Sequence, residues 1–226
     1  AWIPEDKRET MAYSFFDVLA DLHSLDPDEI GLGELGKKEN YIGRQLKTWY
    51  RSWNASIEAA ELDDPRAHDL QRFFLENMPD QGMARVVHGD YGLHNCLFGP
   101  DSTVAAVVDW EISTLGDPLA DLAYALNPWP DHSDALPPSP ESATSVPGFP
   151  SRNELAQRYA DRTGRNLDQL DYYIGFNRWK TAAILHGVYA RYKEGKKSTE
   201  GVDLVEMKER ILGALALAQE AVDRLK

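Results

Sequence analysis

Three polar side chains lie at fixed spacing where a short apolar run breaks into a loop. In VVHGDYGLHN these are His88, Asp90 and Asn95, and Asp109 follows fourteen residues after Asn95, at the end of TVAAVVD. A carboxylate at position 90 can orient an incoming hydroxyl group and accept its proton. The amide oxygen of Asn95 and the carboxylate of Asp109 are ligands of the kind that Mg²⁺ prefers. The spacing therefore predicts a metal-dependent reaction at a hydroxyl group.

The segments around these residues predict the elements that position them. ARVVHG, NCLFG and TVAAVVDW are short, rich in valine and flanked by turn residues, so we expect short strands. The turn at residues 99–102 joins the last two strands into a small hairpin, which brings Asp109 beside Asn95. An apolar strand, the loop H-G-D-x-x-x-x-N and a later carboxylate follow the order of parts in the catalytic lobe of a kinase.

Helical patterns surround this small β region. Apolar residues at helical spacing predict a first helix over residues 7–24, and a second stripe runs through residues 46–57. Asp64, before a proline, is expected to cap a third helix. DPLADLAYAL, with Asp117 as its cap, is expected to be helical, and longer helices are expected near residues 167–193 and 202–225.

One long connection interrupts these helices. Residues 127–150 hold seven of the thirteen prolines, which predicts an irregular Pro-rich loop. Ser151 with Glu154 then forms a capping-box start for the next helix. The fold class expected from the whole pattern is α+β and mainly helical, with residues 1–226 forming a single lobe.

The composition excludes several classes of partner. The net charge of −13 disfavours nucleic acid and anionic membranes, because a negative surface repels phosphates at long range. No segment approaches the 18 apolar residues of a membrane span. The single cysteine, Cys96, cannot form an internal disulfide, so we expect a reducing compartment and a cytoplasmic protein.

Several motifs in order resemble a known family. HGDYGLHN, VVDWE and STLGDPLADLAY resemble the aminoglycoside phosphotransferase and choline kinase family, in which D-W-E stands where protein kinases have D-F-G. DWEISTLGDPLADLAYALNPWP is most similar to the phosphotransferase-like proteins found beside, or fused to, acyl-CoA dehydrogenases. Weaker likeness in LADLHSLD and RQLKTWYRSW extends the resemblance over most of the chain. The resemblance implies a protein-kinase-like C-terminal lobe and an association with an acyl-CoA dehydrogenase.

The resemblance also implies a role for each residue of the motif. Asp90 is the expected catalytic carboxylate, which orients the substrate hydroxyl and accepts its proton. Asn95 and Asp109 are expected to hold Mg²⁺ on the phosphates of ATP, the expected co-substrate. His88 and Asp121 are expected to shape and brace the catalytic loop.

The sequence departs from the family at two places. Gly92 stands where many close relatives carry arginine, so no side-chain cation is available there to meet a phosphate. No glycine-rich loop after a strand and no strand lysine precede the motif, and Lys37 and Lys38 lack strand context. The N-terminal nucleotide lobe is therefore expected to be absent from this chain, which alone would transfer phosphate poorly.

Side chains around Asp90 would select the small-molecule hydroxyl substrate. Trp49, Trp53, Trp129 and Trp179 are the candidate aromatic walls. Glu111 is a candidate for contact with the metal or substrate, with a solvated carboxylate as an equal alternative. An acidic cleft would suit a polycationic aminosugar, whereas the closer resemblance favours a hydroxyacyl thioester.

Two other functions remain open at this stage. The chain could be a catalytically inactive, kinase-like binding module, although retention of the three oxygen-bearing motif residues argues against it. A metal-dependent hydrolase would instead use His88, Asp90, His94 and Asp109 as ligands of one ion.

Overall fold

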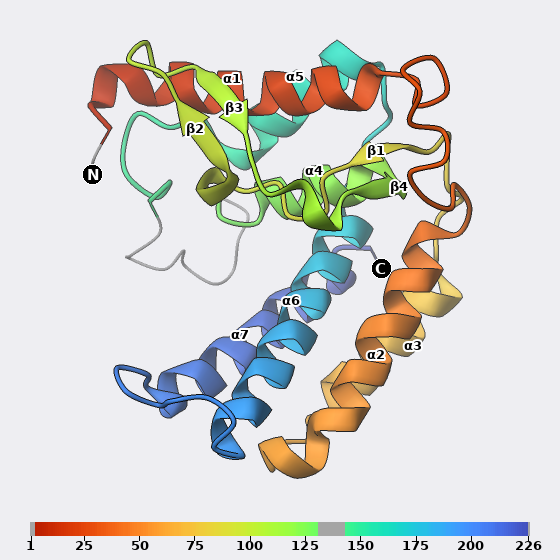
Figure 1. Ribbon diagram of the computed structural model, residues 1–226, viewed down its shortest axis with the longest axis vertical. Coiled ribbons are helices and arrows are strands. Elements are labelled where there is room, and N and C mark those ends of the chain that lie inside the picture. The colour runs from red at the N-terminus through yellow and green to blue at the C-terminus, as the bar shows by residue number, and fades with distance from the viewer. Residues whose placement is uncertain (1–2, 131–142, 226) are drawn as a thin grey trace. The chain divides into compact units, whose positions relative to one another are not determined.

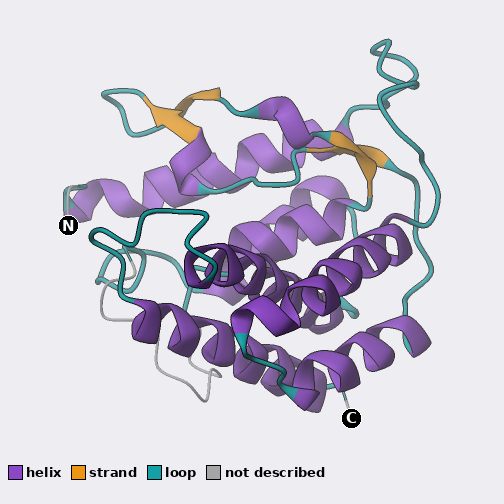
Figure 2. Ribbon diagram, turned by 60° about the horizontal axis from the view of Figure 1, so that its bottom comes forward, coloured by secondary structure: helices purple, strands orange, loops and turns teal. Residues whose placement is uncertain are grey.

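A computed structural model describes residues 3–130 and 143–225, with seven α-helices and four short strands in these ranges. The helices are α1 Glu5–Ser24, α2 Tyr41–Ala60, α3 Pro65–Glu76, α4 Pro118–Leu126, α5 Arg152–Thr163, α6 Leu170–Lys193 and α7 Leu204–Asp223. The strands are β1 Arg85–Val87, β2 Cys96–Phe98, β3 Val104–Val107 and β4 Thr114–Gly116, and single 3₁₀ turns cover Leu93–Asn95 and Trp110–Ile112. The mainly helical α+β composition predicted from the sequence is confirmed (Figures 1 and 2).

The chain divides into two compact units. The loop unit comprises Ala1–Tyr41 and Gln81–Leu170, and the helical unit comprises Ile42–Asp80 and Asp171–Lys226. The prediction of a single lobe over residues 1–226 stays a prediction. Most of the Pro-rich loop, residues 131–142, lies outside the described residues.

The loop unit is built on packing between α1 and α5. Apolar side chains of α1 at Phe15, Phe16 and Leu19 are fully buried, and Leu155 and Tyr159 of α5 pack in the same core. The β2–β3 hairpin lies along α1, where the Val104 N–H donates to Ser14 Oγ over 2.9 Å (Figure 1). This contact holds the turn end of the hairpin against α1.

The strands form two separate pairs. Strand β2 pairs antiparallel with β3, as the turn at residues 99–102 predicted. Strand β1 pairs antiparallel with β4, and Val87 lies opposite Thr114. Sequence patterns missed β4 because its three residues, Thr114–Gly116, are too short to show alternation. Pairing β1 with β4 places Gly116 opposite Arg85, so α4 begins beside the start of β1, and Asp121 of α4 reaches the H-G-D motif at the other end of that strand.

Local capping explains where several helices begin. Asp64 Oδ1 accepts the N–H of Arg66 at the start of α3, and Asp117 accepts the N–H of Leu119 at the start of α4. Ser151 and Glu154 form the reciprocal capping box that begins α5. Each cap satisfies backbone donors that the first helical turn leaves unpaired, and all three were predicted from the sequence.

The helical unit has an aromatic core around α6. Trp179 Nε1 donates to the carbonyl oxygen of Ala67 over 2.9 Å, and Tyr172 Oη donates to that of Phe74 over 2.6 Å. The His186 ring stacks on Trp53 with 4.0 Å between centroids. Within the described residues, no helix is long and apolar enough to span a bilayer.

Candidate active site

The catalytic loop begins at the end of β1 and is held by a buried carboxylate of α4. Asp121 Oδ2 accepts the backbone N–H of His88 over 2.5 Å, and its Oδ1 accepts that of Gly89 over 2.8 Å. Gly89 has a φ of +86°, a left-handed conformation that glycine adopts without strain. Asp121 is 2% exposed, so water does not compete for these bonds. This geometry fits the loop-bracing role expected for Asp121.

A second buried contact lies behind Asp121. His23 of α1 places Nε2 3.5 Å from Asp121 Oδ2, and its Nδ1 lies 2.7 Å from the hydroxyl oxygen of Tyr159 on α5. Burial lowers the pKa of His23, although the neighbouring Asp121 carboxylate acts in the opposite direction. Asp121 is therefore packed among α1, α5 and the loop, and sequence reasoning did not identify His23 as part of this support.

The ring of His88 is built into the loop. Its Nε2 donates to the carbonyl oxygen of Val108 over 2.9 Å, and its Nδ1 accepts the N–H of Asp90 over 3.3 Å. These partners require the neutral ring with its proton on Nε2. Trp110 packs against the ring with 4.8 Å between centroids. Both nitrogens are thus engaged by the backbone, as expected for a loop-shaping histidine.

The carboxylate of Asp90 lies partly exposed at the loop surface and receives three side-chain donors. Tyr124 Oη donates to Oδ1, while Asn95 Nδ2 lies 3.2 Å and His94 Nε2 lies 3.3 Å from Oδ2. Burial pushes the pKa of Asp90 upward, but the hydrogen bonds from Tyr124, His94 and Asn95 outweigh it, so that pKa lies below its usual value. Asp90 is therefore a carboxylate at neutral pH, able to accept a further hydrogen bond.

Asn95 and Asp109 lie at adjoining positions of the hairpin. The N–H of Val108 donates to the carbonyl oxygen of Asn95 over 2.9 Å, which places Asp109 one residue beyond this cross-strand bond. Asn95 Nδ2 donates to the carbonyl oxygen and the carboxylate of Asp90, so its Oδ1 is left as an acceptor. Asp109 is exposed and has a φ of +67°, which turns the chain out of β3. The hairpin thus brings the predicted ligand pair to one end of the strands.

The remaining groups at this end of the hairpin are exposed. Glu111 is exposed in the turn after Asp109, a position that fits both contact with the metal or substrate and a solvated carboxylate. Leu97 is 56% and Val108 38% exposed, and alternation along the strands places both on the face opposite the buried Cys96. Burial raises the pKa of the Cys96 thiol to about 11, so Cys96 is a protonated core residue.

Three of the four candidate tryptophan walls are core residues, and their prediction as walls was wrong. Trp53 and Trp179 are each 1% exposed inside the helical unit, and Trp129 is fully buried in the loop unit. Trp129 packs against Phe16 with 5.7 Å between centroids. Trp49 is half-buried on α2, with its Nε1 donating to Gln45, and stays a candidate. Trp53 and Trp179 lie on helices, where an apolar residue at helical spacing fits a core position as well as a cleft wall.

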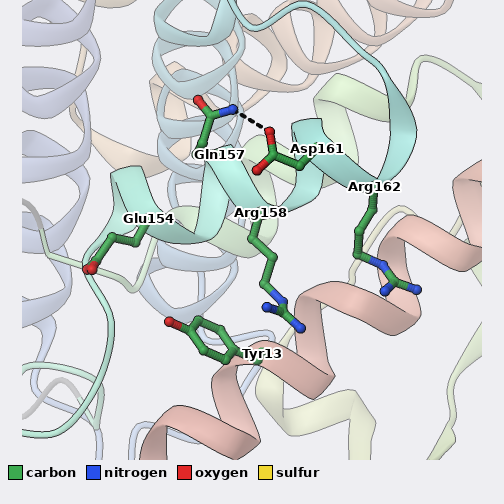
Figure 3. A pocket seen from close by; sticks show the side chains of 6 residues that line it. All are labelled: Tyr13, Glu154, Gln157, Arg158, Asp161 and Arg162. Carbon is green, nitrogen blue, oxygen red and sulfur yellow. Dashed lines mark hydrogen bonds between the residues drawn. The ribbon is translucent and has the colours of Figure 1, made fainter.

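A surface pocket of about 440 Å³ lies on the loop unit between α1 and α5 (Figure 3). Arg158 makes a bidentate ion pair with Asp17, at 2.7 Å for each bond, and its guanidinium lies 4.2 Å from the centroid of Tyr13. Arg162 pairs with Asp21 over 2.6 Å. None of the predicted site residues lines this pocket, and its two arginines are paired with aspartates.

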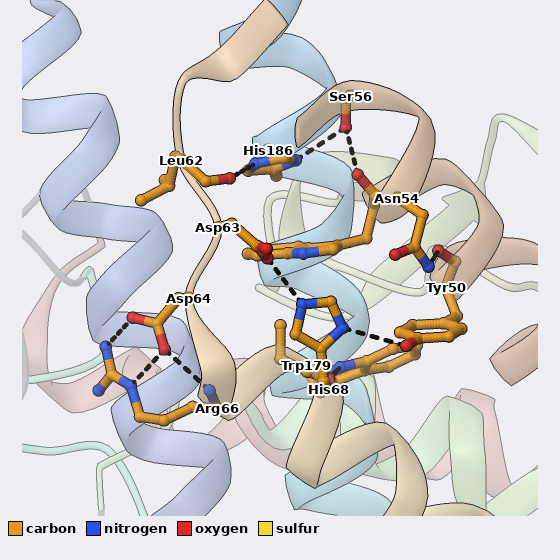
Figure 4. A network of polar contacts seen from close by, with 12 residues as sticks. Tyr50, Asn54, Ser56, Leu62, Asp63, Asp64, Arg66, His68, Trp179 and His186 are labelled. Atoms are coloured by element: carbon orange, nitrogen blue, oxygen red, sulfur yellow. Dashed lines mark hydrogen bonds and ion pairs between the residues drawn. The ribbon is translucent and has the colours of Figure 1, made fainter. Parts of the chain in front are cut away.

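A polar network in the helical unit joins α2, α3 and α6 (Figure 4). His68 contacts Asp63 over 2.6 Å and the Tyr50 hydroxyl over 3.0 Å. His186 donates from Nε2 to the carbonyl oxygen of Leu62 over 2.9 Å, and Ser56 Oγ lies 2.8 Å from its Nδ1. These contacts tie the connection between α2 and α3 to α6, so His186 is a satisfied core histidine.

The geometry disfavours the hydrolase interpretation. Among the residues that the structure describes, no group of three or more His, Cys, Asp or Glu side chains is placed to hold a metal ion. Both nitrogens of His88 are already bonded to the loop backbone. The hairpin instead presents a smaller set of potential metal ligands, the amide of Asn95 and the carboxylate of Asp109.

Comparison with protein-family models identifies the same family that the sequence motifs resemble. Residues 1–173 match the phosphotransferase enzyme family, APH. The chain is 36% identical over 197 residues to acyl-CoA dehydrogenase family member 11 of Gallus gallus, covering 83% of this chain and 25% of that protein. It is 34% identical over 197 residues to acyl-CoA dehydrogenase family member 10 of Mus musculus, covering 85% of this chain and 18% of that protein. The chain thus spans a quarter or less of the length of these two relatives.

Solved structures resemble the chain along nearly its whole length. A Ralstonia eutropha protein with a proposed assignment as an aminoglycoside phosphotransferase superposes with a TM-score of 0.84 at 27% identity, covering 99% of this chain and 68% of that one. A spectinomycin phosphotransferase in complex with ADP and spectinomycin superposes with a TM-score of 0.55 at 15% identity, covering 98% of this chain and 67% of that one, which shows a shared fold. The chain belongs to the APH phosphotransferase enzyme family, as its motifs predicted.

Proposed function

We propose that this chain carries the catalytic centre of an ATP- and Mg²⁺-dependent phosphotransferase that transfers the γ-phosphoryl group to a hydroxyl group of a small molecule. The observation that carries the proposal is the contact between Asp90 and Asn95, in which one amide bridges the backbone and carboxylate of the loop aspartate. This contact ties the group that would receive a proton to a group that would hold a metal. Phosphoryl transfer depends mainly on such positioning and on charge stabilisation.

The proposed reaction balances with ATP and the acceptor alone. The acceptor oxygen forms a bond to the γ-phosphorus while the bond from that phosphorus to the bridging oxygen of ADP breaks. The proton of the acceptor hydroxyl passes to the Asp90 carboxylate and then to solvent. The lowered pKa of Asp90 keeps the group ionised at neutral pH, ready to orient the hydroxyl.

Asn95 and Asp109 fit a magnesium ion that keeps most of its other ligands as phosphate oxygens and water. Asn95 Oδ1 is left as an acceptor because Nδ2 is used, and Asp109 offers an exposed carboxylate. One or two protein carboxyl or amide oxygens beside substrate phosphates are usual for Mg²⁺ in such sites. When bound, Mg²⁺ supplies charge neutralisation on the phosphate oxygens.

The exposed apolar face of the hairpin suits the nucleotide base. Leu97 and Val108 lie on the same side of β2 and β3, next to the proposed metal ligands. A flat heterocycle laid on these side chains would place its phosphates toward Asn95 and Asp109. We propose that further groups gripping the phosphates, such as a strand lysine and a glycine-rich loop, come from a nucleotide lobe outside these 226 residues.

We propose a hydroxyacyl thioester as the acceptor class, with an aminoglycoside-like compound as the second candidate. Support for the thioester comes from the relatives named acyl-CoA dehydrogenase family members 10 and 11, and support for the aminosugar comes from the assignment of the Ralstonia eutropha protein. We also propose functional association with an acyl-CoA dehydrogenase. The lone cysteine fits a reducing environment, and the cytoplasm is the proposed location.

The test is ATP consumption by the natural full-length protein that carries this chain, in parallel with the 226-residue chain itself. The acceptor panel contains hydroxyacyl thioesters, aminoglycosides, choline and simple sugars, each with and without Mg²⁺. Asp90→Asn should lower kcat about 10² to 10⁴-fold, the usual contribution of general acid–base catalysis. Asp80→Asn, at an exposed aspartate after α3, is the matched control and should leave kcat unchanged.

The panel separates the candidate functions. Turnover that depends on Asp90 with a thioester or an aminosugar selects the acceptor class. Full turnover in the Asp90→Asn variant would contradict the proposed mechanism. Ligand binding that is independent of Mg²⁺ and never leads to ATP consumption would instead support a non-catalytic binding module.

A further inference from the structure

Helix α4 contacts the catalytic loop at two points, one of which has no assigned role. Asp121 binds the backbone N–H groups of His88 and Gly89, and Tyr124, three residues later, donates its hydroxyl hydrogen to Asp90 Oδ1. Residues three apart lie on the same face of a helix, so one turn of α4 faces the loop with both side chains. The first contact fixes the path of the backbone, and the second reaches the carboxylate itself.

We propose that Tyr124 is a positioning residue, which holds Oδ1 of Asp90 so that Oδ2 faces the acceptor hydroxyl. This inference rests on the proposed function of Asp90. Tyr124 acts through Asp90 and need not touch the substrate.

The environment of Tyr124 suits a permanent donor. Burial raises the pKa of Tyr124, and the hydrogen bond to the Asp90 carboxylate raises it further, so the phenol keeps its proton near neutral pH. Its helix is fixed at the N-terminus by the Asp117 cap and Pro118. A donor on a fixed helix restricts rotation of the carboxylate about its χ2 angle, which a donor on a mobile side chain would not.

The other two donors to Asp90 differ from Tyr124 in the oxygen they reach. Asn95 and His94 both contact Oδ2, and the His94 side chain is 62% exposed. An acceptor hydroxyl arriving from solvent therefore meets the side of the carboxylate that His94 covers. The substrate hydroxyl can replace the exposed His94 as a hydrogen-bond donor to Oδ2, while Tyr124 continues to donate to Oδ1.

Tyr124→Phe removes the hydroxyl group and keeps the shape of the ring. In the full-length protein it should lower kcat by about 10-fold or more with KM changed less than about 2-fold, because a misdirected base affects the chemical step and not binding. Tyr13→Phe, on the surface of α1, is the matched control and should leave both constants unchanged. A kcat within about 2-fold of wild type for Tyr124→Phe, with Asp90→Asn inactive, would overturn the positioning role alone.

A second readout needs no turnover and uses the 226-residue chain. With 3-fluorotyrosine at position 124, the ¹⁹F resonance should move when Asp90 is replaced by asparagine, whereas a label at Tyr13 should not respond. An unchanged resonance at position 124 would overturn the contact and the inference with it. If Asp90→Asn keeps full turnover while the resonance moves, the contact between Tyr124 and Asp90 is confirmed but Asp90 is not the catalytic carboxylate. The positioning role of Tyr124 would then also be wrong, because it acts through Asp90.

Discussion

The imidazole of His94 occupies the space that a side chain at Gly92 would need. A Cβ atom at position 92 would lie 2.5 Å from Cε1 and 2.7 Å from Nδ1 of His94. Gly92 has a φ of −132°, so its backbone does not require glycine, and the missing side chain is what admits the ring. The absence of a side chain at Gly92 thus allows the imidazole of His94 to reach Asp90.

We predict that Gly92→Ala displaces His94 from Asp90 with little loss of stability. The ring is exposed and can swing into solvent, so the melting temperature should stay within about 4 °C, the shift expected from less than 1 kcal/mol. The change in KM for the acceptor should equal that of His94→Ala. The double variant should match either single variant, because both remove the same contact. Additive effects of the two substitutions would contradict the packing described.

Asp121→Ala should destabilise the protein by about 2–4 kcal/mol, because it leaves the buried N–H group of His88 and the partly buried N–H group of Gly89 without their acceptor. Urea unfolding followed by circular dichroism measures this loss. Asp21→Asn is the control on α1, since its exposed pair with Arg162 should contribute less than about 1 kcal/mol. A loss for Asp121→Ala no larger than that of the control would contradict the bracing role.

Asp109→Asn should weaken the response to Mg²⁺ without disturbing the hairpin. Asparagine tolerates the left-handed conformation at position 109, so the backbone is kept while a charge is removed. In nucleotide-binding titrations of the full-length protein, the Mg²⁺ concentration at half effect should rise about 10-fold, equivalent to about 1.4 kcal/mol. An unchanged Mg²⁺ dependence would remove Asp109 from the proposed metal site.

His186 should make stability fall as pH decreases below neutral. Burial lowers the pKa of His186, and the Leu62 carbonyl and Asp63 offset this only in part. The unfolded chain therefore binds a proton more readily than the folded one below about pH 6.5, and stability is lost as pH falls from there toward the folded pKa. His186→Gln should flatten this part of the profile in urea unfolding between pH 7 and pH 5. If the free energy of unfolding changed with pH equally in His186→Gln and in wild type, His186 would not be the group that causes this loss of stability.

The helices and most of the strands were predicted from the sequence, whereas the residues that pack around the catalytic loop were not. Helix starts at Asp64, Asp117 and Ser151 follow from local capping chemistry, which needs no knowledge of distant contacts. The roles of Tyr124 and His23 depend on contacts across 34 and 98 residues, which periodicity does not reveal. The one available signal for Tyr124 was its place three residues after Asp121, on the same helical face.

The tryptophans show that residue type and helical spacing do not distinguish the wall of a cleft from a core position. An aromatic stripe at helical spacing looks the same whether it lines a cleft or fills a core. Trp53 is stacked on His186, and Trp179 is hydrogen-bonded to the backbone of α3, so neither presents a surface to a ligand. Only tertiary packing separates these buried rings from the half-buried Trp49.

The most direct test of the central claim follows a labelled γ-phosphate from ATP to the acceptor in the full-length protein. Transfer should require Mg²⁺ and fall about 10²-fold or more in Asp90→Asn, because the loop carboxylate would no longer accept the hydroxyl proton. Asp80→Asn should transfer at the wild-type rate. Label reaching the acceptor equally fast in Asp90→Asn and wild type would contradict the account of this site.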